Sequence, residues 1–207
     1  MNHRLVPLLL AAAILAPRTA SAFASLEGFY AISRPPSGSF HSAVSGAVND
    51  PHLLRDSLQI AGGDLILHLG TLEVGAIGDT SWRSSSASQT AIGGLVGIGG
   101  DLGSAVRLEL LGELGGHRYG NFVENPRIVT ASSSSQWLAY VGLRPGIAFH
   151  LTQGTPSVIL GIWGFARWDL DSKSVPMTVS SADNTALGSI KLGGTTIGAV
   201  ARIGLDF

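Results

Sequence analysis

Hydrophobic and polar residues alternate along the chain with a period of two, and residues 104–118 show this most clearly. One parity carries apolar or small side chains: Val106, Leu108, Leu110, Gly112 and Leu114. The opposite parity carries the charges: Arg107, Glu109, Glu113 and His117. Alternate side chains of a β-strand point to opposite faces, whereas a helix would spread these charges around its circumference. The pattern therefore predicts a strand with one apolar face and one charged face.

The same alternation recurs in three later segments. In residues 136–150 the apolar parity runs from Trp137 to Phe149, and in residues 158–170 it ends at Trp168. In the last segment the apolar parity holds Ile197, Ala199, Ala201, Ile203, Leu205 and Phe207. The opposite faces of these segments hold Arg144, Arg167, Asp169, Arg202 and Asp206. Several amphipathic strands with the same two-sided chemistry predict a sheet that separates an apolar environment from a polar one.

Turns and loops divide the chain into eight predicted strands. Short turns at residues 62–64, 100–103 and 152–155 alternate with longer polar loops, which is typical of an up-and-down barrel. The apolar parity of residues 65–82 changes near Gly70, and we interpret this change as a β-bulge. The predicted strands cover residues 26–33, 57–61, 65–82, 89–99, 104–118, 135–150, 157–170 and 186–207. The predicted fold class is all-β, a transmembrane antiparallel up-and-down β-barrel of eight strands.

The composition favours a barrel whose outer wall faces lipid. Hydrophobic residues make up 45% of the chain and charged residues only 13%, where about 25% charged is usual for a soluble domain. A helical membrane protein needs about 20 consecutive apolar residues per span, and residues 23–207 offer no such stretch. The 28 glycines are dispersed, which indicates a structural use. A soluble secreted β-sandwich is the alternative fold.

Residues 1–22 have the parts of a secretory signal peptide. His3 and Arg4 give a positive start, residues 5–15 are apolar, and small residues lead to a cleavage site between Ala22 and Phe23. An N-terminal membrane anchor is the alternative, but the apolar stretch is short for a span and Pro17 interrupts it. We therefore expect residues 1–22 to be cleaved and residues 23–207 to form one barrel domain. The chain has no cysteine, which excludes disulfides and cysteine-linked lipid.

The final strand ends its alternation on an aromatic residue, after Ile203, Leu205 and Phe207. This end resembles the C-terminal strand of bacterial outer-membrane barrels, and the predicted architecture resembles the small OmpA/OmpX-type barrels. The resemblance implies that these three residues are an insertion signal for the barrel-assembly machinery. It also implies export to the outer membrane of a Gram-negative bacterium, with outer-membrane lipid as a partner and surface loops that could meet an extracellular ligand.

Four large aromatic residues fall at the long-loop ends of the predicted strands: Trp82, Tyr119, Trp137 and Trp168. Aromatic side chains form girdles where a transmembrane barrel meets the membrane interface. We therefore expect these four to form one such girdle.

The inward face of the predicted barrel carries charges of both signs: Glu73, Asp79, Arg107, Glu109, Glu113, Arg144, Arg167, Asp169 and Arg202. An eight-stranded barrel has an interior just wide enough for side chains to fill. Buried charges need partners, so these groups are expected to form an ion-pair network that plugs the lumen. A narrow gated ion path is the alternative.

Catalytic and ligand-binding motifs are not evident in the sequence. Glu113 and His117 share a face but lie about 13 Å apart along the strand, too far for a hydrogen bond. The six histidines have no metal-ligand spacing, so no catalytic residue, metal or cofactor is predicted. Without Arg4 and Arg18 of the predicted signal peptide, the chain has 11 basic and 14 acidic side chains and a net charge of −3, a sign that argues against nucleic acid. The expected role is structural or surface interaction, and a lipid A-modifying enzyme or a narrow channel are the alternatives.

Overall fold

The computed structural model describes residues 23–34, 39–42, 58–83, 88–120, 135–152, 154–181 and 184–207. The predicted signal peptide, including Ala22, lies outside the described residues. Phe23 is the first described residue, and 66% of its surface is exposed. Within the described part of the chain, no helix has the length and apolar character needed to cross a membrane.

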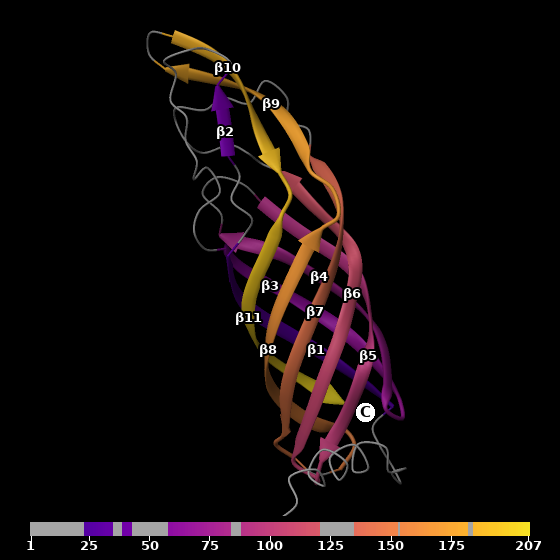
Figure 1. Ribbon diagram of the computed structural model, residues 1–207. Helices are drawn as coiled ribbons and strands as arrows, with labels where there is room; N and C mark the ends of the chain where they lie inside the picture. Colours follow the sequence, from indigo (N-terminus) through magenta and orange to yellow (C-terminus); the bar gives the residue numbers. More distant parts are fainter. Residues whose placement is uncertain are drawn as a thin grey trace, which may run out of the picture.

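Eight strands form a closed antiparallel barrel (Figure 1). The order around the barrel is β1, β3, β4, β5, β6, β7, β8 and β11, and β11 pairs back to β1. The bounds are Ala24–Arg34 for β1, Leu58–Leu69 for β3, Leu72–Arg83 for β4, Ser88–Leu102 for β5, Val106–Gly120 for β6, Gln136–His150 for β7, Ser157–Asp169 for β8 and Thr195–Asp206 for β11. The predicted all-β class and the eight-stranded barrel are confirmed.

The barrel closes between its first and last strands. The register runs from Ser25 opposite Asp206 to Arg34 opposite Ile197. The Phe207 amide donates a hydrogen bond of 2.8 Å to the carbonyl oxygen of Ala24. The hydrogen bond between Phe207 and Ala24 lies at the end of the barrel where residues 70–71, 103–105 and 151–156 join successive strands. We call this end the turn end and the opposite one the loop end.

The prediction for residues 57–82 was correct in strand number but wrong in its boundary. Gly62, Gly63 and Asp64, predicted as a turn, lie within β3, and the predicted bulge at Gly70 is a hairpin turn. Gly70 has a φ of +75°, a conformation that glycine adopts without steric cost. The apolar parity changes there because the chain reverses direction, with Leu69 opposite Leu72.

Three further strands form a separate small sheet in the order β2, β10, β9. Their bounds are Ser39–Ser42, Asn184–Leu192 and Lys173–Ser181. The prediction of a loop over residues 171–185 and of one strand over residues 186–207 was therefore wrong. Gly193 and Gly194, with φ of +106° and +140°, separate β10 from β11, because these conformations interrupt an extended strand. In Figure 1 this sheet extends beyond the loop end of the barrel.

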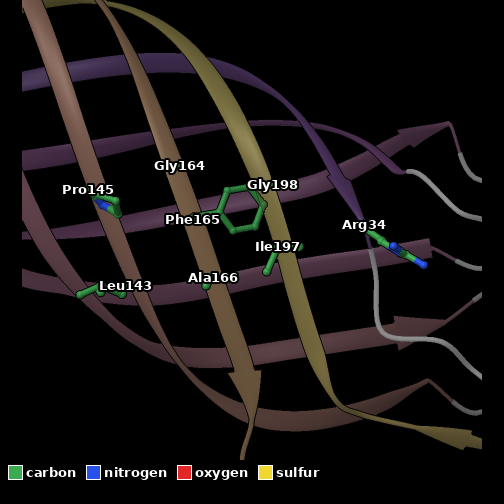
Figure 2. A pocket seen from close by; sticks show the side chains of 8 residues that line it. All are labelled: Arg34, Leu143, Pro145, Gly164, Phe165, Ala166, Ile197 and Gly198. Carbon is green, nitrogen blue, oxygen red and sulfur yellow. The ribbon is translucent and has the colours of Figure 1, made fainter.

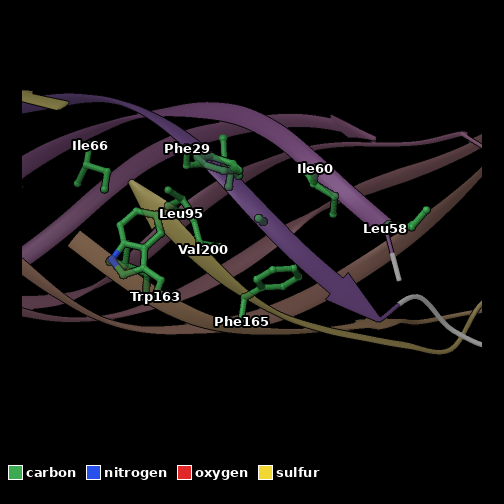
Figure 3. Close-up of a cluster of buried hydrophobic side chains, with 11 residues drawn as sticks. Phe29, Leu58, Ile60, Ile66, Leu95, Trp163, Phe165 and Val200 are labelled. Carbon is green, nitrogen blue, oxygen red and sulfur yellow. The ribbon is translucent and has the colours of Figure 1, made fainter. Parts of the chain in front are cut away.

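The barrel wall separates an apolar outside from a mixed inside. The outward parity is rich in exposed apolar residues, including Leu65, Ile92, Leu110, Leu143, Ile162 and Ile203. The inside holds a cluster of buried apolar side chains, among them Phe29, Ile66, Leu95, Phe165 and Val200 (Figure 3). Buried charged side chains, together with polar and aromatic ones such as Gln89 and Tyr140, fill the remainder of the interior. In a soluble barrel, water would favour polar side chains on the outer wall. Here the outer wall is apolar instead.

Exposed aromatic residues lie near both ends of the outer wall. Trp137 and Trp168 face outward at the loop end, whereas Phe149 and Phe207 face outward at the turn end. Trp137 and Phe149 stand at opposite ends of β7, about 40 Å apart along the strand and roughly 30 Å apart along the axis at the usual tilt. The girdle prediction was wrong for Tyr119, whose side chain is buried inside. The side chain of Trp82 lies outside the described residues.

Candidate functional site: the charged lumen

The inward face of β6 orders the lumen from one end to the other. From the turn end to the loop end it presents Arg107, Glu109, Glu113, His117 and Tyr119, all buried. The spacing follows from period-two alternation, which places every second side chain inside. Each of these groups contacts polar side chains from other strands. The lumen can therefore be described as four levels: the turn end, the lower middle, the upper middle and the loop end.

At the turn end, Arg107 of β6 bridges acids from the adjacent strand β5 and from the next strand, β4. Its guanidinium pairs with Glu73 of β4 and lies 3.0 Å from Asp101 Oδ1. His68 Nδ1 lies 3.1 Å from Glu73 Oε1, and its Nε2 lies 3.4 Å from Asp206 Oδ1. Charge-assisted contacts of this kind are the means by which buried charges are stabilised. The first level therefore joins β3, β4, β5, β6 and β11.

The lower middle of the lumen is organised by Arg202 of β11. Its Nη1 lies 2.7 Å from Glu27 Oε2, and its Nη2 lies 2.8 Å from Glu109 Oε2. Glu109 also contacts Arg107, at 3.4 Å, and accepts a hydrogen bond of 3.2 Å from Trp163 Nε1. Arg202 therefore connects β1, where the barrel closes, with β6.

The upper middle of the lumen holds two arginines around one glutamate. Glu113 forms ion pairs with both arginines: its Oε1 lies 3.1 Å from Arg144 Nε, and its Oε2 lies 2.6 Å from Arg167 Nε. Arg144 also pairs with Asp64 at 3.2 Å, and Arg167 with Asp79 at 2.8 Å. Five strands contribute to this level, and every one of the five side chains is buried.

The Trp163 ring connects the two middle levels. The guanidinium carbons of Arg144 and Arg202 lie 3.5 and 3.9 Å from the ring centroid. Such cation–π contacts are attractive and are strengthened where water is excluded. Trp163 fits because its neighbour on β7 is Gly146, where an added Cβ would lie 1.7 Å from Trp163 Cδ1. A glycine on the inward face here provides room for a large side chain of the adjacent strand.

At the loop end, a histidine, an aspartate and two tyrosines form a compact group. His117 Nδ1 lies 2.8 Å from Asp169 Oδ1, and the Tyr119 hydroxyl donates a hydrogen bond of 2.7 Å to Asp169 Oδ2. The His117 ring stacks on Tyr140, with centroids 4.2 Å apart. The side chains of His117 and Asp169 are both 0% exposed. His117 therefore has its acid partner on β8, two strands from β6, and not at Glu113 on its own strand.

The structure places all nine predicted lumen residues on the inside of the wall. Eight of them are buried residues, and the ninth, Asp169, has a buried side chain. Sequence reasoning missed Glu27, Asp64, His68 and Trp163 as members of the network. Glu27 shares the parity of Ser25 and Phe29, a signal that was present in the sequence. Asp64 was hidden by the incorrect turn at residues 62–64, because a turn residue has no assigned face.

Among the described residues, no group of three histidine, aspartate or glutamate side chains has the arrangement of a metal site. The acids of the lumen are instead engaged by arginine and histidine side chains of the chain itself. The chemistry that this arrangement supports is mutual neutralisation of charge and exclusion of ions from a narrow interior.

No protein-family model matches the sequence, and no curated protein matches it. Solved structures do share the fold. Neisserial surface protein A (NspA) is similar over 91% of this chain and 100% of its own, with 12% identity and a TM-score of 0.54. The outer membrane protein OprG from Pseudomonas aeruginosa is similar over 90% of this chain and 99% of its own, with 13% identity and a TM-score of 0.53. The fold is therefore that of the eight-stranded outer-membrane β-barrels.

Proposed function

We propose that this protein is an outer-membrane barrel of a Gram-negative bacterium, with a sealed lumen, that holds its loop end at the cell surface for a structural or interaction role. The observation that carries the proposal is the ion-paired lumen. Arg144, Arg167 and Arg202, each buried and each paired with two carboxylates, occupy the middle of the barrel. A pore would need water in the space that these side chains fill.

The outer wall supports a position in the membrane. All eight barrel strands contribute exposed apolar side chains to this wall, and aromatic residues stand near both of its ends. The separation of Trp137 and Phe149, roughly 30 Å along the barrel axis at the usual strand tilt, fits the hydrocarbon thickness of a bilayer. Closure of the sheet pairs every barrel strand on both sides, which is the condition for strands to cross lipid.

Conductance across a planar lipid bilayer tests the sealed lumen. The purified, folded chain should insert and give no stepwise ion current, whereas a porin added to the same bilayer gives steps. Insertion is checked in parallel by protease protection in vesicles and by a gel shift between unheated and heated samples. Reproducible current steps from the inserted protein would overturn the proposal of a sealed lumen and show that the protein is a narrow channel.

The burial of His117 and Asp169 favours the structural role over the enzymatic alternative. A general base must reach a substrate proton within hydrogen-bond distance, and the side chains of this pair are 0% exposed. Mass spectrometry of lipid A from cells that express the protein should therefore show the same species as cells without it. A new lipid A mass that disappears in a His117→Ala variant would establish the enzyme instead.

A further inference from the structure

A shallow groove lies on the outer wall, where small side chains interrupt the apolar surface. Its centre is formed by Gly164 of β8 and Ala199 of β11, which are cross-strand partners. Ile32 of β1 lies next to Ala199 in the register, and Pro145 of β7 lines the other side of Gly164. A glycine and an alanine between two bulky neighbours leave a depression, which we call the wall groove.

The wall groove extends along the strands in both directions. Towards the turn end its floor and sides include Ala201 and Ile162, which are opposite each other. Towards the loop end it continues past Ala166 and Ile197 to Arg34, the partner of Ile197 on β1 (Figure 2). The two adjoining parts have volumes of about 740 and 560 Å³ and share Pro145 and Gly164.

The groove combines an apolar length with a cation at one end. Among the described outward positions of the barrel strands, charged side chains occur at Arg34 and Arg118, both near the loop end. The exposed Arg34 side chain lines the groove, and a guanidinium matches the geometry of a phosphate group. On β8, Trp168 lies two residues closer to the loop end than Ala166, which shares the register of Ile197 and Arg34. Arg34 therefore lies near the loop-end aromatic residues, where lipid headgroups begin.

We propose that the wall groove binds an acyl chain of lipid A, with a lipid A phosphate held by Arg34. The inference rests on the proposed position in the outer membrane, because the long loops of such barrels face outward. Lipid A combines apolar chains with a phosphorylated headgroup, and this is the combination that the groove and Arg34 complement. An apolar protein partner would have no use for the cation at the end of the groove.

Native mass spectrometry of the full chain in phosphatidylcholine nanodiscs that contain lipid A tests this site. Gly164→Leu fills the centre of the groove, and Arg34→Gln removes the charge. The matched control is Gly94→Leu on β5, another outward glycine on a strand that does not border the groove. Added Cβ atoms at Gly164 and Gly94 have their nearest neighbours at 4.0 and 3.8 Å, so both variants can fold.

The expected result is one lipid A molecule retained by the wild type and by Gly94→Leu. Retention should fall by roughly tenfold in Arg34→Gln, as loss of a charge-assisted hydrogen bond implies, and at least as much in Gly164→Leu. Equal retention in all four proteins would overturn the inference, as would a wild-type dimer that Gly164→Leu abolishes, which would make the groove a protein interface. Failure of the wild type to enter nanodiscs at all would contradict the proposed function instead.

Discussion

Each lumen arginine contacts more than one carboxylate, and this sharing determines what a single substitution does. Arg144 pairs with Asp64 and Glu113, and Arg202 with Glu27 and Glu109. A buried ion pair contributes little net stability, but removal of one partner leaves a charge without compensation. The lumen is therefore more sensitive to loss of an arginine than the number of contacts would indicate.

Arg144→Ala should lower the free energy of unfolding by about 3–5 kcal/mol, because two buried acids lose a shared partner. Urea titration of the folded protein in lipid vesicles, followed by tryptophan fluorescence, measures this change. Arg118→Ala, which removes an exposed arginine at the loop end of β6, serves as the control and should change stability by less than about 0.5 kcal/mol. Equal effects of the two substitutions would show that the lumen ion pairs are not buried as described.

Gly146→Ala should lower stability by about 1–3 kcal/mol, the usual range for overpacking an interior. The added methyl group would lie 1.7 Å from Trp163 Cδ1, so the indole ring has to move away from Arg144 and Arg202. The matched control is Gly164→Ala, on the outer face of the neighbouring strand, where the nearest heavy atom is 4.0 Å away. If the outward substitution is as destabilising as the inward one, Gly146 is not the position that makes room for Trp163.

At the scale of elements, alternation predicted the strands but did not locate every turn. The strands β6, β7 and β8 were predicted to within two residues because their apolar and charged parities are regular. The β3–β4 hairpin was misplaced because Gly62-Gly63-Asp64 resembles a turn in composition, whereas a sheet accepts these glycines where neighbouring strands approach closely. An added Cβ at Gly63 would lie 2.9 Å from the Glu27 carbonyl oxygen.

A four-residue insertion distinguishes the hairpin turn at Gly70 from the turn that the sequence predicted at residues 62–64. Placed between Gly70 and Thr71, it lengthens a hairpin loop and should leave folding intact, since loop tips tolerate insertions. Placed between Gly62 and Gly63, it interrupts β3 between its partners β1 and β4 and should prevent barrel formation. The shift between unheated and heated samples on a gel measures folding, and the opposite pattern would restore the turn at residues 62–64.

At the scale of the whole molecule, the sequence predicted the barrel and the inward parity but not the partners within the lumen. Parity assigns a side chain to a face, and this sufficed for Arg107, Glu113 and Arg202. Partners across the lumen depend on strand stagger and on which glycines leave room, so the contact of His117 with Asp169, on strands that are not adjacent, could not be predicted. The small β2, β10, β9 sheet was not predicted because β2 has only four residues and β9 contains Pro176, and because most of β10 was joined with β11 in one predicted strand.

Whether the barrel wall crosses a membrane can be measured by the depth of spin labels along the outward face of β6. Because the native chain contains no cysteine, single cysteines at Arg118, Leu114, Leu110 and Val106 can be labelled uniquely in vesicle-inserted protein. Accessibility to oxygen relative to a water-soluble nickel complex reports depth. Labels at Leu114 and Leu110 should lie deeper than labels at Arg118 and Val106, as expected for a strand that crosses the bilayer once. High accessibility to the nickel complex at all four positions would contradict it.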